Sequence, residues 1–132
     1  MCEEKYGKSM SNLTLSSLLK RFLGGVGDVR SIILSTLDGA ELVAEYKSAQ
    51  FVEDAQVVSL LVPSFVVSVD QSSRFELGAT KHAMTWSGNF VYMQFIVEKI
   101  VVSIVMDESA NIGLVEEQLP ELKNILSPLF RE

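Results

Sequence analysis

The sequence is poor in the residues that build metal and disulfide sites. It has one cysteine, Cys2, and one histidine, His82, among 132 residues. A lone cysteine cannot form a disulfide within the chain, which fits a reducing compartment. Zinc sites need several cysteine, histidine or carboxylate ligands at short spacing, and Cys2 and His82 lie far apart in the sequence. We therefore expect no metal ion and no other cofactor.

Basic residues are also in the minority. The chain carries 11 lysines and arginines against 17 aspartates and glutamates, for a formal net charge of −6. Proteins that bind nucleic acid usually present a basic face, and anionic membranes likewise attract basic segments. The charge balance therefore disfavours nucleic-acid binding and direct docking on a membrane.

Signals for membrane insertion are missing as well. The first residues, MCEEK, are polar and acidic, unlike a secretory signal peptide. Glycine does not follow Met1, which excludes N-myristoylation. No uninterrupted apolar run reaches the ~18 residues typical of a membrane-spanning helix. We expect no segment to cross a membrane, so any contact with one should be indirect, through partners.

Catalytic motifs are absent from the sequence. There is no Gly-x-Ser-x-Gly elbow and no set of kinase motifs. The glycines at 24, 25 and 27 follow a predicted helix and precede a strand, which is the wrong order for a phosphate-binding loop. His82 is best interpreted as structural or solvated, because a catalytic base needs an oriented partner. Glu116 and Glu117 would favour the dipole at a helix start. We expect no catalytic residue.

Hydrophobic residues, by contrast, are abundant at 48%, with a mean hydropathy of +0.27. This is apolar for a small protein, and it indicates either a dense core or surface that a partner covers. The length predicts a single domain. We expect a flexible tail over residues 1–11, which lack periodicity, and a folded domain over residues 12–132.

Periodicity predicts a mixed fold with the order α-β-β-α-β-β-β-α. This order implies an α+β domain with a five-stranded, mostly antiparallel sheet and helices on both faces. The strand at 100–106 is apolar on both faces and belongs in the middle, whereas the strand at 79–86 carries Lys81 and His82 and suits an edge. The predicted helices lie near 15–23, 63–75 and 112–129, and the predicted strands at 30–36, 40–46, 79–86, 90–96 and 100–106.

Two prolines should modify the helices. Proline fits the first turn of a helix and costs ~3 kcal/mol deeper inside it. We therefore expect the regular middle helix to begin near Pro63, with residues 55–62 as a separate or kinked turn. For the same reason we expect a break or kink at Pro120.

The middle helix has two apolar sides. One side carries a stripe that should cover the sheet, formed by Val58, Leu61, Val62, Phe65 and Val69. On the opposite side, Leu60 and Val67 lie among Ser64 and Gln71. One sheet covers only one side of a helix, so these four residues are predicted to face a partner. Trp86, at the end of the edge strand, is a further interface candidate because interfaces are enriched in tryptophan.

Several short motifs, in register with this element order, resemble the roadblock/LC7 family. The Asp-Gly turn is weak evidence because such turns are common, whereas the stretches DQSS and SANIGL are far more specific. The similarity runs from about Leu18 to Phe130. The motifs are STLDG at 35–39, VPSF at 62–65, DQSS at 70–73, LG at 77–78 and SANIGL at 109–114.

The resemblance implies a paired protein. In roadblock/LC7 dimers, the middle helices of two subunits pack antiparallel, and the strand after each helix joins its counterpart in one continuous sheet. On this chain, the implied subunit interface combines the helix side with the edge strand. Its residues are Leu60, Ser64, Val67, Gln71, Ala79, Lys81, Ala83 and Trp86.

Within the family, the sequence is most similar to the MEK-partner scaffold type of subunit found in the lysosomal Ragulator complex. That similarity implies a heterodimer with a second roadblock/LC7 subunit. It also implies other Ragulator subunits, Rag GTPases and MAP-kinase components as partners, in amino-acid (TOR) signalling. The protein would be cytoplasmic and recruited to the surface of the late endosome or lysosome through those partners.

Two other functions stay open at this point. One is a homodimeric roadblock protein that regulates a small GTPase directly. The other is a small enzyme on a similar scaffold, against which the lack of paired histidine, cysteine or metal-ligand motifs speaks. A deep pocket lined by convergent polar side chains would favour the enzyme.

Overall fold

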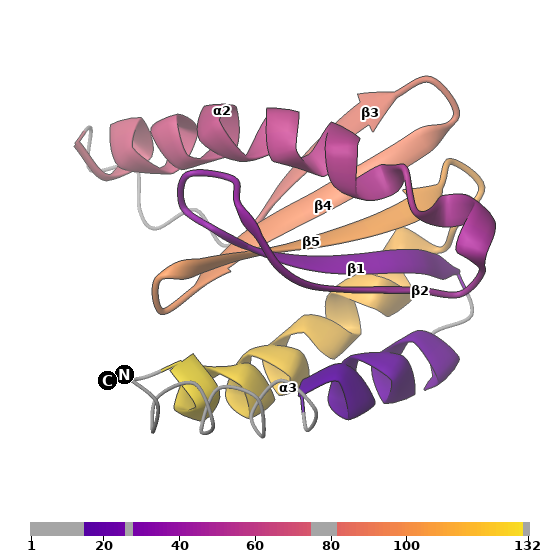
Figure 1. The fold of residues 1–132 in the computed structure, drawn as a ribbon. Helices are drawn as coiled ribbons and strands as arrows, with labels where there is room; N and C mark the ends of the chain where they lie inside the picture. The colour runs from indigo at the N-terminus through magenta and orange to yellow at the C-terminus, as the bar shows by residue number, and fades with distance from the viewer. Residues whose placement is uncertain (1–14, 26–27, 75–81, 131–132) are drawn as a thin grey trace.

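The computed structural model describes residues 15–25, 28–74 and 82–130 (Figure 1). An N-terminal helix over residues 15–25 precedes the first strand. The elements that follow are β1 (Val29–Thr36), β2 (Glu41–Tyr46), a short 3₁₀ turn η1 (Ala49–Phe51), α2 (Asp54–Arg74), β3 (Ala83–Ser87), β4 (Phe90–Val97), β5 (Ile100–Asp107) and α3 (Ile112–Phe130). This is the predicted element order, with the short turn η1 added between β2 and α2.

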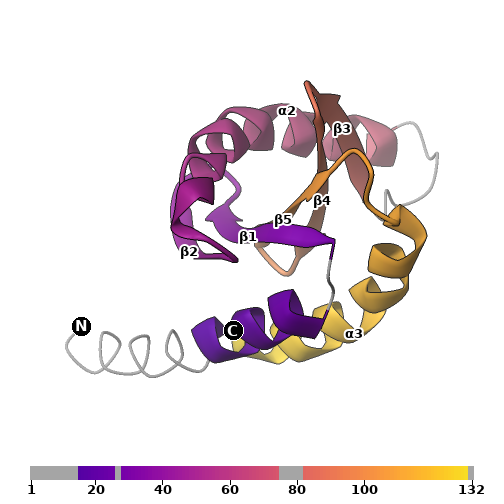
Figure 2. The ribbon, with the colours of Figure 1, turned by 90° about the vertical axis from the view of Figure 1, so that its right-hand side faces the viewer.

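The five strands form one antiparallel sheet in the order β2-β1-β5-β4-β3. β5 lies in the middle and β3 at an edge, as predicted. Figures 1 and 2 show α2 on one face of the sheet, and the N-terminal helix and α3 together on the other. The α+β fold with helices on both faces is confirmed. Of the predicted strand 79–86, residues 79–81 lie outside the described part.

Each face of the sheet carries its own hydrophobic core. The larger core lies under the N-terminal helix and α3 and includes Leu19, Phe95 and Leu126. The smaller one lies under α2, where Val58 and Phe65 pack on the sheet. The apolar stripe predicted for the middle helix is thus on its inner side.

The start of the middle helix was predicted wrongly. α2 begins at Asp54 and continues through Pro63 to Arg74. Proline removes the hydrogen bond that it would donate to Ser59, but inner-stripe residues on both sides of it pack on the sheet. Burial of each large aliphatic or aromatic side chain contributes roughly 1.5–3 kcal/mol, and several together outweigh the proline's cost. Tertiary packing thus keeps the helix continuous.

The last helix bends but does not break. α3 contains Pro120 and Pro128, and Figure 2 shows it changing direction along its length. The helix is continuous through Pro120, so the alternative of a break there is wrong, and a kink at this residue stays a prediction. At its start, the side-chain oxygen of Asn111 accepts a hydrogen bond from the Leu114 amide at 3.3 Å, as a helix cap does.

The β1–β2 turn packs closely on α2. Gly39 has φ +98°, and a Cβ at this position would lie 3.0 Å from the Ser59 carbonyl oxygen. We expect Gly39→Ala to lower the free energy of unfolding by about 1–3 kcal/mol, from both the left-handed backbone and the contact. Urea denaturation measures the change.

The matched control is Gly88→Ala. Gly88 also has a positive φ, +61°, but its Cβ would have open space. Gly88→Ala should therefore lower the free energy of unfolding less than Gly39→Ala does. Equal losses for the two variants would contradict the role of the contact with α2.

Candidate subunit interface

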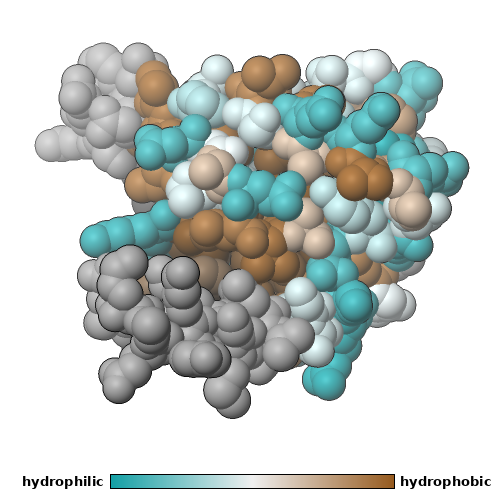
Figure 3. Space-filling view, in the orientation of Figure 1, coloured by the Kyte–Doolittle hydropathy of each residue, from teal (hydrophilic) through white to brown (hydrophobic). Residues whose placement is uncertain are grey.

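The outer side of α2 exposes large hydrophobic side chains. Leu60 is 78% exposed and Val67 is 54% exposed, and Ser64 between them is also exposed. These three residues lie opposite the inner stripe, as the helical wheel predicted. Figure 3 shows hydrophobic side chains at the surface along α2, interspersed with hydrophilic ones. Water-exposed leucine and valine at helical spacing are typical of a surface that a partner covers.

The continuity of α2 also makes it a long apolar helix. The segment Ala49–Val69 is long and apolar enough to cross a membrane, with a mean hydropathy of 1.5, because the helix through Pro63 joins two apolar runs. Helices that pack on the core of a protein can have the same length and composition, so the expectation that no segment crosses a membrane stays a prediction. Only 22% of the segment is buried within the chain. One side of α2 nevertheless packs on the sheet, and its first residue, Asp54, is held in an ion pair.

That ion pair fixes the start of α2. Asp54 is 4% exposed and accepts hydrogen bonds from Arg30 Nε at 2.9 Å, from Arg30 Nη2 at 2.6 Å and from Ser31 Oγ at 2.5 Å. The Arg30 guanidinium lies over the ring of Phe51, 4.3 Å from its centroid, and over the ring of Phe90, 3.9 Å from its centroid. The hydrogen bonds to Asp54 raise the pKa of Arg30 above its usual value. One arginine thus joins β1, η1, α2 and β4.

The edge strand β3 contributes side chains to both faces of the sheet. Ala83 packs on the α2 side, whereas Met84 packs on the α3 side. Because side chains alternate along a strand, Trp86 shares the face of Met84. Trp86 is 59% exposed. It therefore lies on the sheet edge but not on the face that carries Leu60 and Val67.

The structure thus brings part of the predicted interface together. Leu60, Ser64 and Val67 lie on one side of α2, and Ala83 lies at the sheet edge on the same face. Gln71 belongs to α2, but its side chain is outside the described part. Ala79 and Lys81 also lie outside the described residues.

His82 has a partner that sequence reasoning missed. His82 Nε2 lies 2.7 Å from Glu116 Oε2 of α3. The two residues are 34 positions apart, and no local motif connects them. A shallow pocket of about 400 Å³ adjoins the pair, and Lys123 and Asn124 also line it. The described lining offers no hydroxyl or thiol that could act as a nucleophile beside the histidine.

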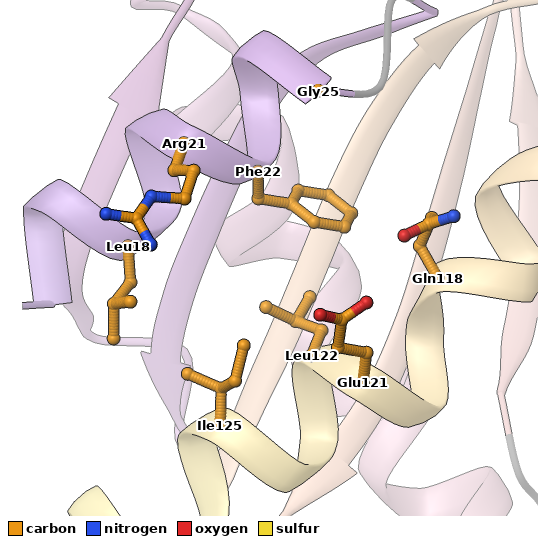
Figure 4. A pocket seen from close by; sticks show the side chains of 8 residues that line it. All are labelled: Leu18, Arg21, Phe22, Gly25, Gln118, Glu121, Leu122 and Ile125. Carbon is orange, nitrogen blue, oxygen red and sulfur yellow. The ribbon is translucent and has the colours of Figure 1, made fainter.

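Another pocket, of about 260 Å³, lies between the N-terminal helix and α3. Leu18, Phe22 and Leu122 contribute apolar walls. Figure 4 shows that its polar side chains point in different directions, with Arg21 turned away from Glu121. Polar groups that do not converge on one point do not make a catalytic site. In the described parts of the chain, no group of three histidine, cysteine or acidic residues is placed to hold a metal ion.

Comparison with known proteins identifies relatives in sequence. A family model described as "Mitogen-activated protein kinase kinase 1 interacting" matches residues 14–131. The mouse (Mus musculus) protein named Ragulator complex protein LAMTOR3 is 29% identical over 122 residues, covering 86% of this chain and 90% of that protein.

Solved structures share the fold. The roadblock/LC7 domain from Streptomyces avermitilis aligns with a TM-score of 0.72 at 10% identity, covering 86% of this chain and 94% of that one. The gliding protein MglB from Thermus thermophilus aligns with a TM-score of 0.75 at 13% identity, covering 90% of each chain. The roadblock/LC7 fold implied by the sequence motifs is confirmed.

Proposed function

This chain belongs to the family described as mitogen-activated protein kinase kinase 1 interacting, and from that premise we propose that it is a non-catalytic scaffold subunit that pairs with a second roadblock/LC7 protein. The observation that carries the proposal is the exposed outer side of α2, with Leu60, Ser64 and Val67. We take residues 12–132 as the pairing domain and residues 1–11 as a tail outside it.

The shape and chemistry of this surface support pairing through α2. Ser64 is small and lies between Leu60 and Val67, which lets a second helix approach closely. Among the described strands, β3 pairs only with β4, and its other edge lies beside α2 and offers backbone groups that a partner strand can use. A stable interface buries ~1,600 Å² in total, and a helix side plus a strand edge suit that size.

The finer role follows the sequence resemblance. We place the protein in a Ragulator-like complex, where it supports Rag GTPase (TOR) signalling and MAP-kinase scaffolding at the late endosome or lysosome. The name of the mouse relative and the description of the family support this placement. The membrane would be reached through other subunits.

A pull-down tests the proposal. Tagged full-length chain is captured from lysate of its native cells, and bound proteins are quantified by mass spectrometry against a Leu60→Asp variant. We expect a second roadblock/LC7 subunit and Ragulator components with the unchanged chain, and their depletion with the variant. Recovery of neither class of protein with the unchanged chain would contradict the proposal.

A homodimer that acts directly on a small GTPase is the second candidate, and the similarity in fold to MglB over 90% of each chain fits it. The net charge of the chain disfavours the homodimer, because self-pairing brings together two chains of net charge −6. The native mass of the isolated chain, 14.6 kDa as a monomer, separates the two candidates. A stable homodimer would favour the GTPase regulator.

A further inference from the structure

The His82–Glu116 contact links the predicted pairing edge to the opposite helical layer. His82 directly precedes β3, and Glu116 lies in the second turn of α3. Their side chains are 23% and 39% exposed, and the 2.7 Å separation is that of a hydrogen bond. Met84, on the same face of β3, packs into the core below α3. The contact therefore points the start of β3 toward α3 and away from α2.

Within the described residues, β3 is a short edge strand. In the described sheet it pairs only with β4, from Ala83 opposite Gln94 to Ser87 opposite Phe90. It is five residues long, and its residues are half-buried or exposed. The His82–Glu116 hydrogen bond therefore fastens the strand end that precedes the first sheet pair.

The residues around the His82–Glu116 contact include one other charged side chain, that of Lys123. Lys123 lines the same pocket, but its Nζ lies over the Phe95 ring, 5.3 Å from the centroid. Among the described residues that line this pocket, Glu116 is the acidic one, and Lys123 is the one lysine or arginine. Among the described residues, the carboxylate that contacts His82 is that of Glu116, which belongs to a different element.

We propose that the His82–Glu116 hydrogen bond is a positioning contact that sets the start of β3 for pairing with a second subunit. The inference rests on the proposed function. It extends that function by making α3 part of what determines the strength of pairing. A bond between α3 and the edge strand lowers the ordering cost of the strand before a partner strand adds to it.

The test compares His82→Ala with His82→Gln. Glutamine keeps an N–H donor at the end of its side chain, whereas alanine removes it. The matched control is Ser127→Ala, which removes the hydrogen bond that Ser127 Oγ donates to Glu98 Oε1 between α3 and the β4–β5 turn. Each full-length variant is titrated with the purified roadblock subunit recovered in the pull-down, and the unfolding midpoint of each unpaired variant is recorded.

We expect His82→Ala to weaken pairing roughly tenfold, the equivalent of one hydrogen bond to a charged group. His82→Gln should restore most of the affinity, and Ser127→Ala should leave it unchanged. Hydrogen exchange of the Ala83–Ser87 amides should accelerate in His82→Ala only. Because His82 is the single histidine, the NMR signals of its ring nitrogens do not overlap with those of another histidine, and they report the bond to Glu116.

Two results would overturn the inference. If His82→Ala lowers the unfolding midpoint but leaves pairing and β3 exchange unchanged, the contact is structural only, and the proposed function stands. If the unchanged chain pairs with no roadblock subunit, the proposed function and this inference both fail.

Discussion

Val67→Asp should reduce the affinity of this protein for its second subunit roughly a hundredfold or more, because a carboxylate buried in an apolar interface finds no partner. Val67 is 54% exposed in the single chain, so the same substitution should change the free energy of unfolding little. Titration of the purified partner, followed by calorimetry or fluorescence anisotropy, measures the loss.

Leu114→Asp is the matched control. Leu114 is 53% exposed, on α3 and on the other face of the sheet. It introduces the same charge at the same exposure but outside the proposed interface. Equal affinities for Val67→Asp and the unchanged chain would show that this side of α2 does not face the partner. A comparable loss in Leu114→Asp would show a general effect of charge.

Asp54→Ala should lower the free energy of unfolding by about 3–5 kcal/mol, because it leaves the Arg30 guanidinium in a largely buried position without its carboxylate. The total free energy of unfolding of most domains is only about 5–15 kcal/mol, so this loss is large. Asp54 also anchors the first turn of α2 through Arg30 and Ser31. Urea denaturation followed by circular dichroism measures the change.

The control for this prediction replaces both members of the pair. A double variant, Arg30→Met with Asp54→Leu, removes both charges and should recover part of the lost stability. A loss below about 1 kcal/mol for Asp54→Ala would be typical of an exposed ion pair. That result would contradict the role given to Asp54 at the start of α2.

Much of the fold follows from local pattern. Alternating and continuous apolar runs predicted five strands, and the contrast between 100–106 and 79–86 predicted which strand is central and which lies at an edge. The structure also follows the alternation of a strand, with Met84 packed on the face opposite Ala83. These predictions succeed because the side-chain period of a strand is set by the backbone alone.

What sequence reasoning missed depends on contacts between distant residues. Pro63 argues locally for a helix start, and only packing of the inner stripe on the sheet keeps α2 continuous. Arg30 and Asp54 are 24 positions apart, and His82 and Glu116 are 34 apart. No spacing rule connects such pairs before the strand order is known. In the sequence, Asp54 is only an acidic residue ahead of an apolar run, and its burial and its partner Arg30 appear only in the structure.

The interface was predictable only in part for a related reason. The outer side of α2 shows in the sequence because Leu60 and Val67 break an otherwise polar face. Lys81 and His82 predicted that the strand at 79–86 lies at an edge, but backbone groups carry edge pairing, so the sequence does not show whether a partner strand pairs there.

Native mass spectrometry of the complex purified through this chain tests the central claim most directly. The account predicts one copy of this 14.6 kDa chain bound to one copy of a different roadblock/LC7 subunit, and a single unpaired chain when Val67 is replaced by aspartate. A mass equal to two copies of this chain, or an unpaired chain without any substitution, would contradict it.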